Sequence, residues 1–149
     1  MSYLNINLDD VQEQKAAPKG QYEVTITGAE ETVTGENSKH PGSPMIKVFI
    51  AFTDLELNAA NMTHYISLPF EGDENANFKL LMLKRFLHLF KLTKGGEVNL
   101  ESIIQEMPGA IAQVEVDLAE PNANGDVYNR PRIPRLKEEH SRGKGHPPR

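Results

Sequence analysis

The chain has 149 residues, of which 38% are apolar and 25% charged, a composition typical of one soluble globular domain. It contains no cysteine, which excludes disulfides, thiol nucleophiles and cysteine-ligated zinc or iron–sulfur sites. The net charge of −5 is unevenly spread, because residues 130–149 carry seven basic and two acidic side chains. An acidic body therefore precedes a basic end. This end either contacts a polyanion or only makes the chain more soluble.

Alternating apolar side chains predict three strands in the first half of the chain, at 21–29, 45–53 and 62–68. A shorter alternation at residues 4–8 predicts an edge strand before them, and a loop rich in turn-forming residues at 34–44 separates the first two. In the second and third strands the alternation turns Ile46 and its apolar partners inward. It turns Lys47, Phe49 and Tyr65 outward.

The second half of the chain begins with a predicted helix at 78–92. Its predicted apolar face comprises Phe78, Leu81, Met82, Phe86, Leu89 and Phe90, and its polar stripe comprises Lys84, His88 and Lys91. A short second helix is predicted at 100–106, a fourth strand at 110–118 and a hairpin turn at 122–126. A last strand at 127–136 contains Pro131 and Pro134, so we expect it to be an edge or partly paired.

This order of elements predicts a mainly β fold. The order matches a five-stranded, OB-fold-like Greek-key barrel with one helix between strands 3 and 4. An open antiparallel sheet with a helix packed on it is the alternative that the order leaves open. We expect residues 1–136 to form the OB-fold-like domain and residues 137–149 a disordered basic tail, because the tail has almost no apolar side chains.

Four segments resemble a family of small phage proteins encoded among replication and recombination genes. They are PKGQYEVTI at 18–26, GSPMIKV at 42–48, YISL at 65–68 and LKRFL at 83–87. The resemblance covers about residues 18–92, and beyond it the chain is similar only in strand order. It implies an OB-fold-like protein that binds single-stranded DNA or assists recombination in the cytoplasm of the infected bacterial host. Phage replication or recombination proteins are the protein partners that it implies.

Catalytic motifs are not apparent in the sequence. There is no phosphate-binding Gly-rich loop with Lys-Ser/Thr, and no histidine stands at metal-ligand spacing from another histidine or a carboxylate. We therefore expect no enzymatic activity, no metal and no cofactor. No apolar run reaches the ~18–20 residues of a membrane-spanning helix, and no signal peptide is apparent, so we expect no membrane partner.

Nine residues are candidates for contacts with DNA. Rings on an outer sheet surface can stack on bases, and cations can meet phosphates, which is how nucleic-acid-binding barrels work. In this fold the loops between strands 1 and 2 and between strands 4 and 5 border that surface. The candidates are Lys39, His40, Lys47, Phe49, Tyr65, Tyr128, Arg130, Arg132 and Arg135.

The predicted function is sequence-independent binding of single-stranded DNA in phage replication or recombination. A non-enzymatic module that binds a host or replisome protein is the main alternative, and a small virion component is a third interpretation. The sequence leaves open the oligomeric state, a homo-oligomer included.

Overall fold

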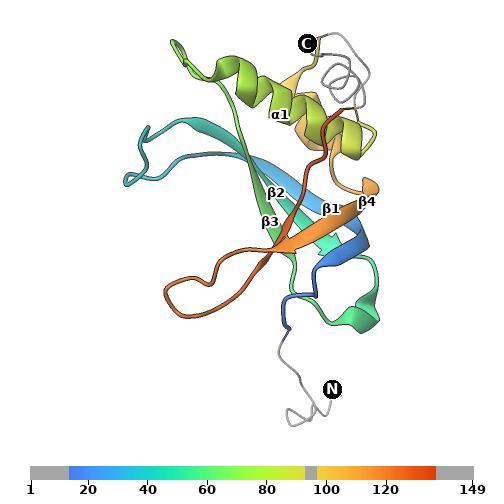
Figure 1. The fold of residues 1–149 in the computed structure, drawn as a ribbon. Helices are drawn as coiled ribbons and strands as arrows, with labels where there is room; N and C mark the ends of the chain where they lie inside the picture. The colour runs from blue at the N-terminus through green and yellow to red at the C-terminus, as the bar shows by residue number, and fades with distance from the viewer. Residues whose placement is uncertain (1–13, 93–96, 137–149) are drawn as a thin grey trace, which may run out of the picture.

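The computed structural model describes residues 14–92 and 97–136, in which three strands come first, two helices follow and two further strands complete the sheet (Figure 1). Each long strand shows the alternation of buried and exposed side chains that its sequence predicts. In chain order the elements are β1 (Gly20–Val33), β2 (Pro44–Phe52), the 3-10 turn η2 (Leu55–Leu57), β3 (Met62–Ser67), α1 (Ala76–Leu89), α2 (Leu100–Glu106), β4 (Ile111–Leu118) and β5 (Asn129–Pro131).

All five strands belong to one antiparallel sheet with the order β3-β2-β1-β4-β5. The end strands β3 and β5 also contact each other, so the sheet curls into a nearly closed barrel. The residues at 15–17 touch both ends of the sheet. Lys15 bridges to Ala59 just before β3, and Ala17 exchanges two hydrogen bonds with the side chain of Asn129 in β5.

A bulge in β1 lets this one strand serve both halves of the barrel. The register passes from Ile26 opposite Ile50 to Gly28 opposite Phe49, which leaves Thr27 as an extra residue. Such a bulge increases local twist. The first half of β1 pairs with β4 and its second half continues along β2. The strand runs to Val33, beyond the predicted end at residue 29, because the β2 partner stays in register even where the apolar alternation stops.

The hydrophobic core fills the inside of the barrel and the space beneath the helices. The inward residues of β1, β2, β3 and β4 meet side chains from both helices, and the burial of this apolar surface is the main stabilising contribution to the fold. The helical contribution comes from Leu83, Phe86, Leu87, Phe90, Ile103 and Met107. Lys84, His88 and Lys91 are exposed, so the predicted polar stripe of the long helix is confirmed.

Three sequence-based expectations differ from the structure. The stretch between β3 and β4 holds two helices, so a barrel with one helix there does not match, although the short second helix predicted at 100–106 is itself confirmed as α2. Phe78 was expected in the core, but it is 60% exposed, because it lies in the first turn of α1, ahead of the turns that pack on the sheet. The last strand spans Asn129–Pro131 instead of 127–136, since prolines at 131 and 134 have no N–H to extend the ladder.

Two further expectations fall outside the described residues. These are the edge strand at 4–8 and the tail at 137–149. The predicted turn at 122–126 is present, with Gly125 at a φ of +81° and the Asn122 side chain accepting hydrogen bonds from the backbone of Asn124 and Asp126.

Candidate nucleic-acid interface

Three outward side chains of β2 and β3 form what we call the aromatic surface: Lys47, Phe49 and Tyr65. Lys47 stands directly opposite Tyr65 in the ladder. Its Nζ lies 5.2 Å from the centre of the Phe49 ring and 5.9 Å from that of Tyr65, within the range of cation–π attraction. Tyr65 is 50% exposed, so its ring is accessible to a ligand. The alternation in the sequence predicts this grouping, and the structure brings the three side chains into contact.

The backbone beneath the aromatic surface is held on both sides. β2 is hydrogen-bonded to β1 on one side and β3 on the other, and the Thr27 hydroxyl donates to the Phe49 carbonyl at 3.3 Å. Gly28 lies opposite Phe49, and a Cβ added there would sit 3.5 Å from the ring, so the ring lies over a position without a side chain. Phe49 is therefore half-buried, whereas Tyr65 is exposed.

The aromatic surface has little net charge. Glu30 stands opposite Lys47 on the β1 side, as Tyr65 does on the β3 side. Cross-strand neighbours of opposite sign attract each other weakly when they are exposed to solvent. This surface therefore offers ring faces and one cation beside an acid, and it provides stacking more than net positive charge.

Lys39 and His40 lie in the β1–β2 loop, and both are exposed. The centre of the His40 ring is 5.1 Å from the centre of the Phe70 ring. Lys79 Nζ lies over the same Phe70 ring, 4.5 Å from its centre. Lys79 also donates a hydrogen bond to Asp73, which holds the pKa of that carboxyl below its usual value. The loop tip is thus in contact with the segment that leads into α1.

The other four candidates lie on the β4–β5 side of the barrel. Tyr128 is exposed, and its hydroxyl accepts a 3.4 Å hydrogen bond from the Asn122 side chain. Arg130 projects from β5, opposite Asp117. Arg132 and Arg135 line one cleft together. The nine candidates therefore fall into three groups instead of one continuous groove.

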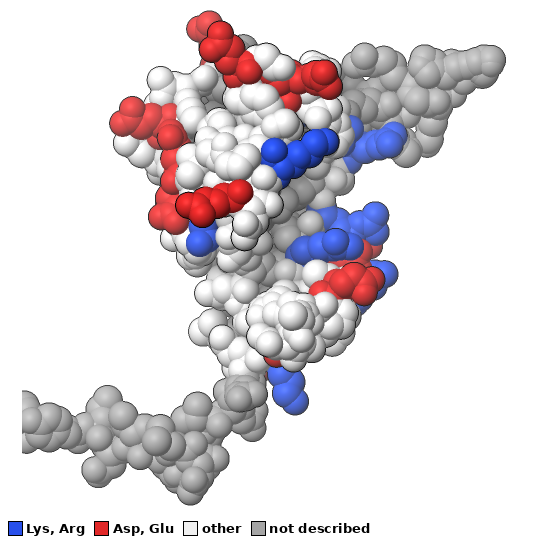
Figure 2. All heavy atoms as spheres, turned by 90° about the vertical axis from the view of Figure 1, so that its left-hand side faces the viewer, with Lys and Arg blue, Asp and Glu red and all other residues white. Residues whose placement is uncertain are grey.

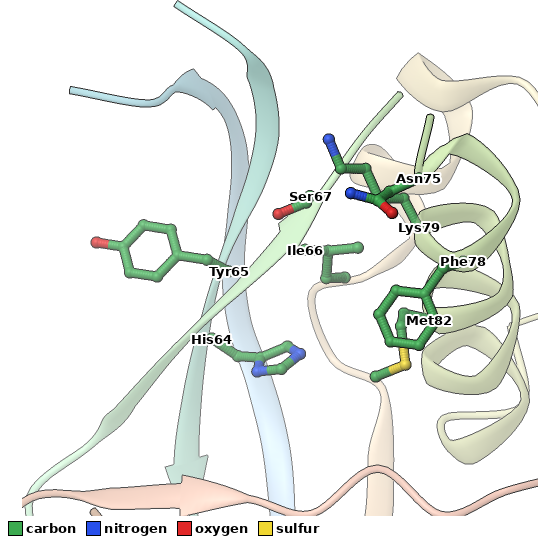
Figure 3. Close-up of a pocket in the computed structure, with 8 residues that line it drawn as sticks. All are labelled: His64, Tyr65, Ile66, Ser67, Asn75, Phe78, Lys79 and Met82. Carbon is green, nitrogen blue, oxygen red and sulfur yellow. The ribbon is translucent and has the colours of Figure 1, made fainter. Parts of the chain in front are cut away.

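A cleft of about 320 Å³ separates β3 from the first half of α1, as Figure 3 shows. Sequence reasoning missed it, because Phe78 was assigned to the core. The only feature of the sequence that could have indicated the cleft is the position of Phe78 at the start of the helical pattern, where a helix can extend past the edge of the sheet on which it packs. The lining comprises His64, Tyr65, Ile66, Ser67, Asn75, Phe78, Lys79 and Met82.

His64 faces this cleft from β3, with its ring stacked against Phe86 of α1 at 5.4 Å between centres and 8° between planes. Burial disfavours the charged imidazolium and lowers the pKa of His64 to about 4. The side chain is therefore neutral at physiological pH, and its ring packs on the buried Phe86. This agrees with the strand alternation, which turns His64 to the same side as Met62 and Ile66.

Charge is unevenly distributed on the face drawn in Figure 2. Acidic side chains gather in its upper left part, and most of the lysine and arginine side chains in view gather toward the right. Within 14–92 and 97–136, no three histidine, aspartate or glutamate side chains come together as metal ligands would. No helix in these two ranges is long and apolar enough to cross a membrane.

The sequence matches one family model over nearly its whole length. This is the family described as a protein of unknown function, DUF669, and the match spans residues 4–142. The chain belongs to this family. A search of curated proteins finds no match to the sequence.

Proposed function

We propose that this DUF669 protein binds single-stranded DNA without sequence preference, in support of phage replication or recombination in the cytoplasm of the infected bacterial host. The protein acts by holding or protecting the strand, and it catalyses no reaction. The observation that carries the proposal is the aromatic surface, where Lys47 lies between the rings of Phe49 and Tyr65 on neighbouring strands.

The barrel supports this proposal through its strand order. In an OB-fold the strand faces near β2 and β3 bind nucleic acid, and the β1–β2 and β4–β5 loops border them. The sheet here has the order β3-β2-β1-β4-β5 with β3 contacting β5, and both helices stand between β3 and β4 in the chain. We assign an OB-like fold on this basis. In such a fold the aromatic surface would occupy the position that OB barrels use for single strands.

Stacking explains the preference for unpaired DNA. A flat ring can lie against the face of an exposed base, whereas paired bases hide their faces inside the duplex. Each stacked base contributes roughly 1–3 kcal/mol. Because Glu30 faces Lys47 across the ladder, the charge contribution at this surface is small, and stacking provides most of the affinity there.

The test is a fluorescence titration with labelled oligo-dT across a range of salt concentrations. Counterion release from single strands gives a log–log slope of about −0.7 for each neutralised phosphate. With about three to five phosphates contacted, the slope should be roughly −2 to −4. No detectable binding to oligo-dT at low salt would contradict the proposal.

A second candidate function, a non-enzymatic module for binding a host or replisome protein, is favoured by the cleft between β3 and α1. β3 is an end strand of the sheet, and the cleft beside it exposes the Phe78 ring, next to the half-buried Met82 and the buried Ile66. Exposed apolar side chains next to an end strand suit an extended segment of another protein. The same titration separates the two functions, since this one requires no affinity for oligo-dT.

A further inference from the structure

A second cleft, of about 420 Å³, lies between α1 and the chain that follows β5. We call it the arginine cleft, because Arg85 of α1 lines it together with Arg132 and Arg135. In Figure 1 the segment after β5, coloured red, runs from the sheet toward α1, which brings these distant parts of the sequence together. The remaining lining residues are Gln21, Leu89, Gln113, Glu115, Ile133 and Pro134.

The chemistry of this lining favours an anion. Each guanidinium presents several N–H donors in one plane, the geometry that phosphate oxygens accept best, and the amides of Gln21 and Gln113 add further donors. Glu115 is the one acid in the lining, so the three arginines outnumber it. Its carboxylate is 3.9 Å from Arg132 and both side chains are more than half exposed, so this ion pair is weak and a competing anion can displace it.

The segment that carries Arg132 is anchored through its backbone. The Arg132 N–H donates to the Glu115 carbonyl at 2.8 Å, and the half-buried Ile133 packs against the core. The side chain of Arg132 is therefore left to face the cleft, while its main chain is fixed. Arg85 stands on a helix whose neighbouring residues Phe86 and Leu87 are buried, which fixes its position as well.

We propose that the arginine cleft binds backbone phosphates of the same DNA strand whose bases stack on the aromatic surface. This inference rests on the proposed function. Gln21 in the cleft and Gly28 beside Phe49 lie on one strand, β1, seven residues apart. At ~3.3 Å per residue this is about 23 Å. A single strand needs about seven nucleotides to cover that length at the ~3.4 Å spacing of stacked bases, and about four when it is extended to roughly twice that spacing.

The length requirement makes the inference testable with two oligonucleotides, dT3 and dT20. The variant Arg85→Gln/Arg135→Gln removes two cations from the cleft. The control variant Lys84→Gln/Lys91→Gln also removes two cations. Lys84 lies on the exposed stripe of α1 and Lys91 just after the end of this helix, and neither lines the cleft. Binding of each oligonucleotide is titrated from 0.05 to 0.5 M salt, with circular dichroism to check folding.

We expect the cleft variant to lose affinity for dT20 by tenfold or more at about 0.1 M salt and to have a log–log slope shallower by about 1.4, since two phosphate contacts are lost. Its affinity for dT3, which is too short to span both sites even when extended, should stay within twofold of the wild type. The control should change neither affinity by more than about twofold. If the cleft variant is unstable, Arg135→Gln alone should show half the change in slope.

Several results would overturn the inference. One is a dT20 affinity in the cleft variant equal to that of the control, and another is an equal loss for dT3 and dT20. If inorganic phosphate at matched ionic strength raises the thermal stability of the wild type and not of the cleft variant, while both bind dT20 equally well, the cleft takes free phosphate instead of a DNA strand. If the wild type binds neither oligonucleotide, the proposed function fails together with the inference. In the other cases the wild type still binds DNA, and only the inference about the cleft fails.

Discussion

The aromatic surface and the arginine cleft stand on opposite halves of the sheet and are built in different ways. The aromatic surface lies on β2 and β3, where long antiparallel ladders fix the backbone on both sides of β2. The arginine cleft depends on β5, which pairs with β4 over three residues, and on a segment without regular structure after it. One region offers rings with balanced charge and the other offers charge, so the two would make separable contributions to a single binding reaction.

The largest effect should come from removing both rings of the aromatic surface. Phe49→Ala/Tyr65→Ala should weaken binding of dT20 by about 2–4 kcal/mol, because two stacked bases lose their partners. The salt slope should change little, since no cation is removed. The preference for single over double strands should largely disappear. Fluorescence titrations with dT20 and with a duplex of equal length measure both quantities.

Two control variants sharpen this test. Leu55→Ala removes an apolar side chain that is 88% exposed and is not part of the aromatic surface, so it should leave binding unchanged. Phe49→Leu/Tyr65→Leu keeps apolar volume but removes the flat rings, so it should lose most of the affinity while remaining folded. A double leucine variant that binds as well as the wild type would show that hydrophobic contact, and not stacking, is responsible.

The β5 half should depend on a single side chain, that of Asn129. This carboxamide is 8% exposed, accepts from Ala17 N–H at 2.7 Å and donates to the Ala17 carbonyl at 2.9 Å. Asn129→Ala leaves those backbone groups without partners, which should lower the free energy of unfolding by about 2–3 kcal/mol. Urea denaturation measures this loss.

The matched control for Asn129 is Asn75→Ala. Asn75 precedes α1 without a side-chain capping bond, so its replacement should change the free energy of unfolding by less than about 0.5 kcal/mol. Hydrogen exchange on Asn129→Ala should show faster opening of β5 than of β2. Equal loosening of both strands would mean that the two halves of the sheet unfold as one unit.

A third difference concerns pH, through His64 on the α1 side of β3. In the folded chain the pKa of His64 is lowered to about 4, whereas an unfolded histidine has a pKa near 6.5. Between these values the unfolded chain binds more protons, so stability is complete above about pH 6.5 and falls as the pH falls toward 4. We expect a loss of about 2 kcal/mol over that window, measured by urea denaturation at several pH values.

His64→Phe isolates this effect, because phenylalanine can keep the stack on Phe86 and cannot titrate. The carboxyl groups titrate in both proteins, so the difference between the two pH profiles belongs to His64. The variant should lose less stability than the wild type between pH 6.5 and 4. Parallel profiles would show that the imidazole binds protons equally well in the folded and the unfolded chain, so that burial does not lower its pKa.

The two regions were not equally predictable from sequence. The period-2 alternation of β2 and β3 is sufficient to place Lys47, Phe49 and Tyr65 on one outer surface, because neighbouring strands with short connections pair. Arg85 was not predicted as a site residue, since its meeting with Arg132 and Arg135 depends on the path of an irregular segment. Alternation cannot predict such a path, which is set by tertiary contacts such as the packing of Ile133.

Two local features also lay beyond sequence reasoning. The bulge at Thr27 shifts the register of β1 by one residue, and only the paired strand reveals it. The exposure of Phe78 follows from where α1 begins to overhang the sheet, which the helical pattern does not contain. Both features influence the sites, because the bulge sets which residue of β1 faces Lys47.

The smallest effect tests that register directly. Glu30 stands opposite Lys47 on the outer face, and Glu31, its neighbour, stands opposite the inward Ile46. Glu30→Gln removes a carboxylate next to the aromatic surface, so affinity for dT20 should rise by about 0.5 kcal/mol, roughly twofold in Kd, mostly at low salt. Glu31→Gln removes the same charge from the other side of the strand and should give a smaller change. Equal gains from both would mean that only the net charge of the chain matters, and that DNA does not approach Lys47 along this face.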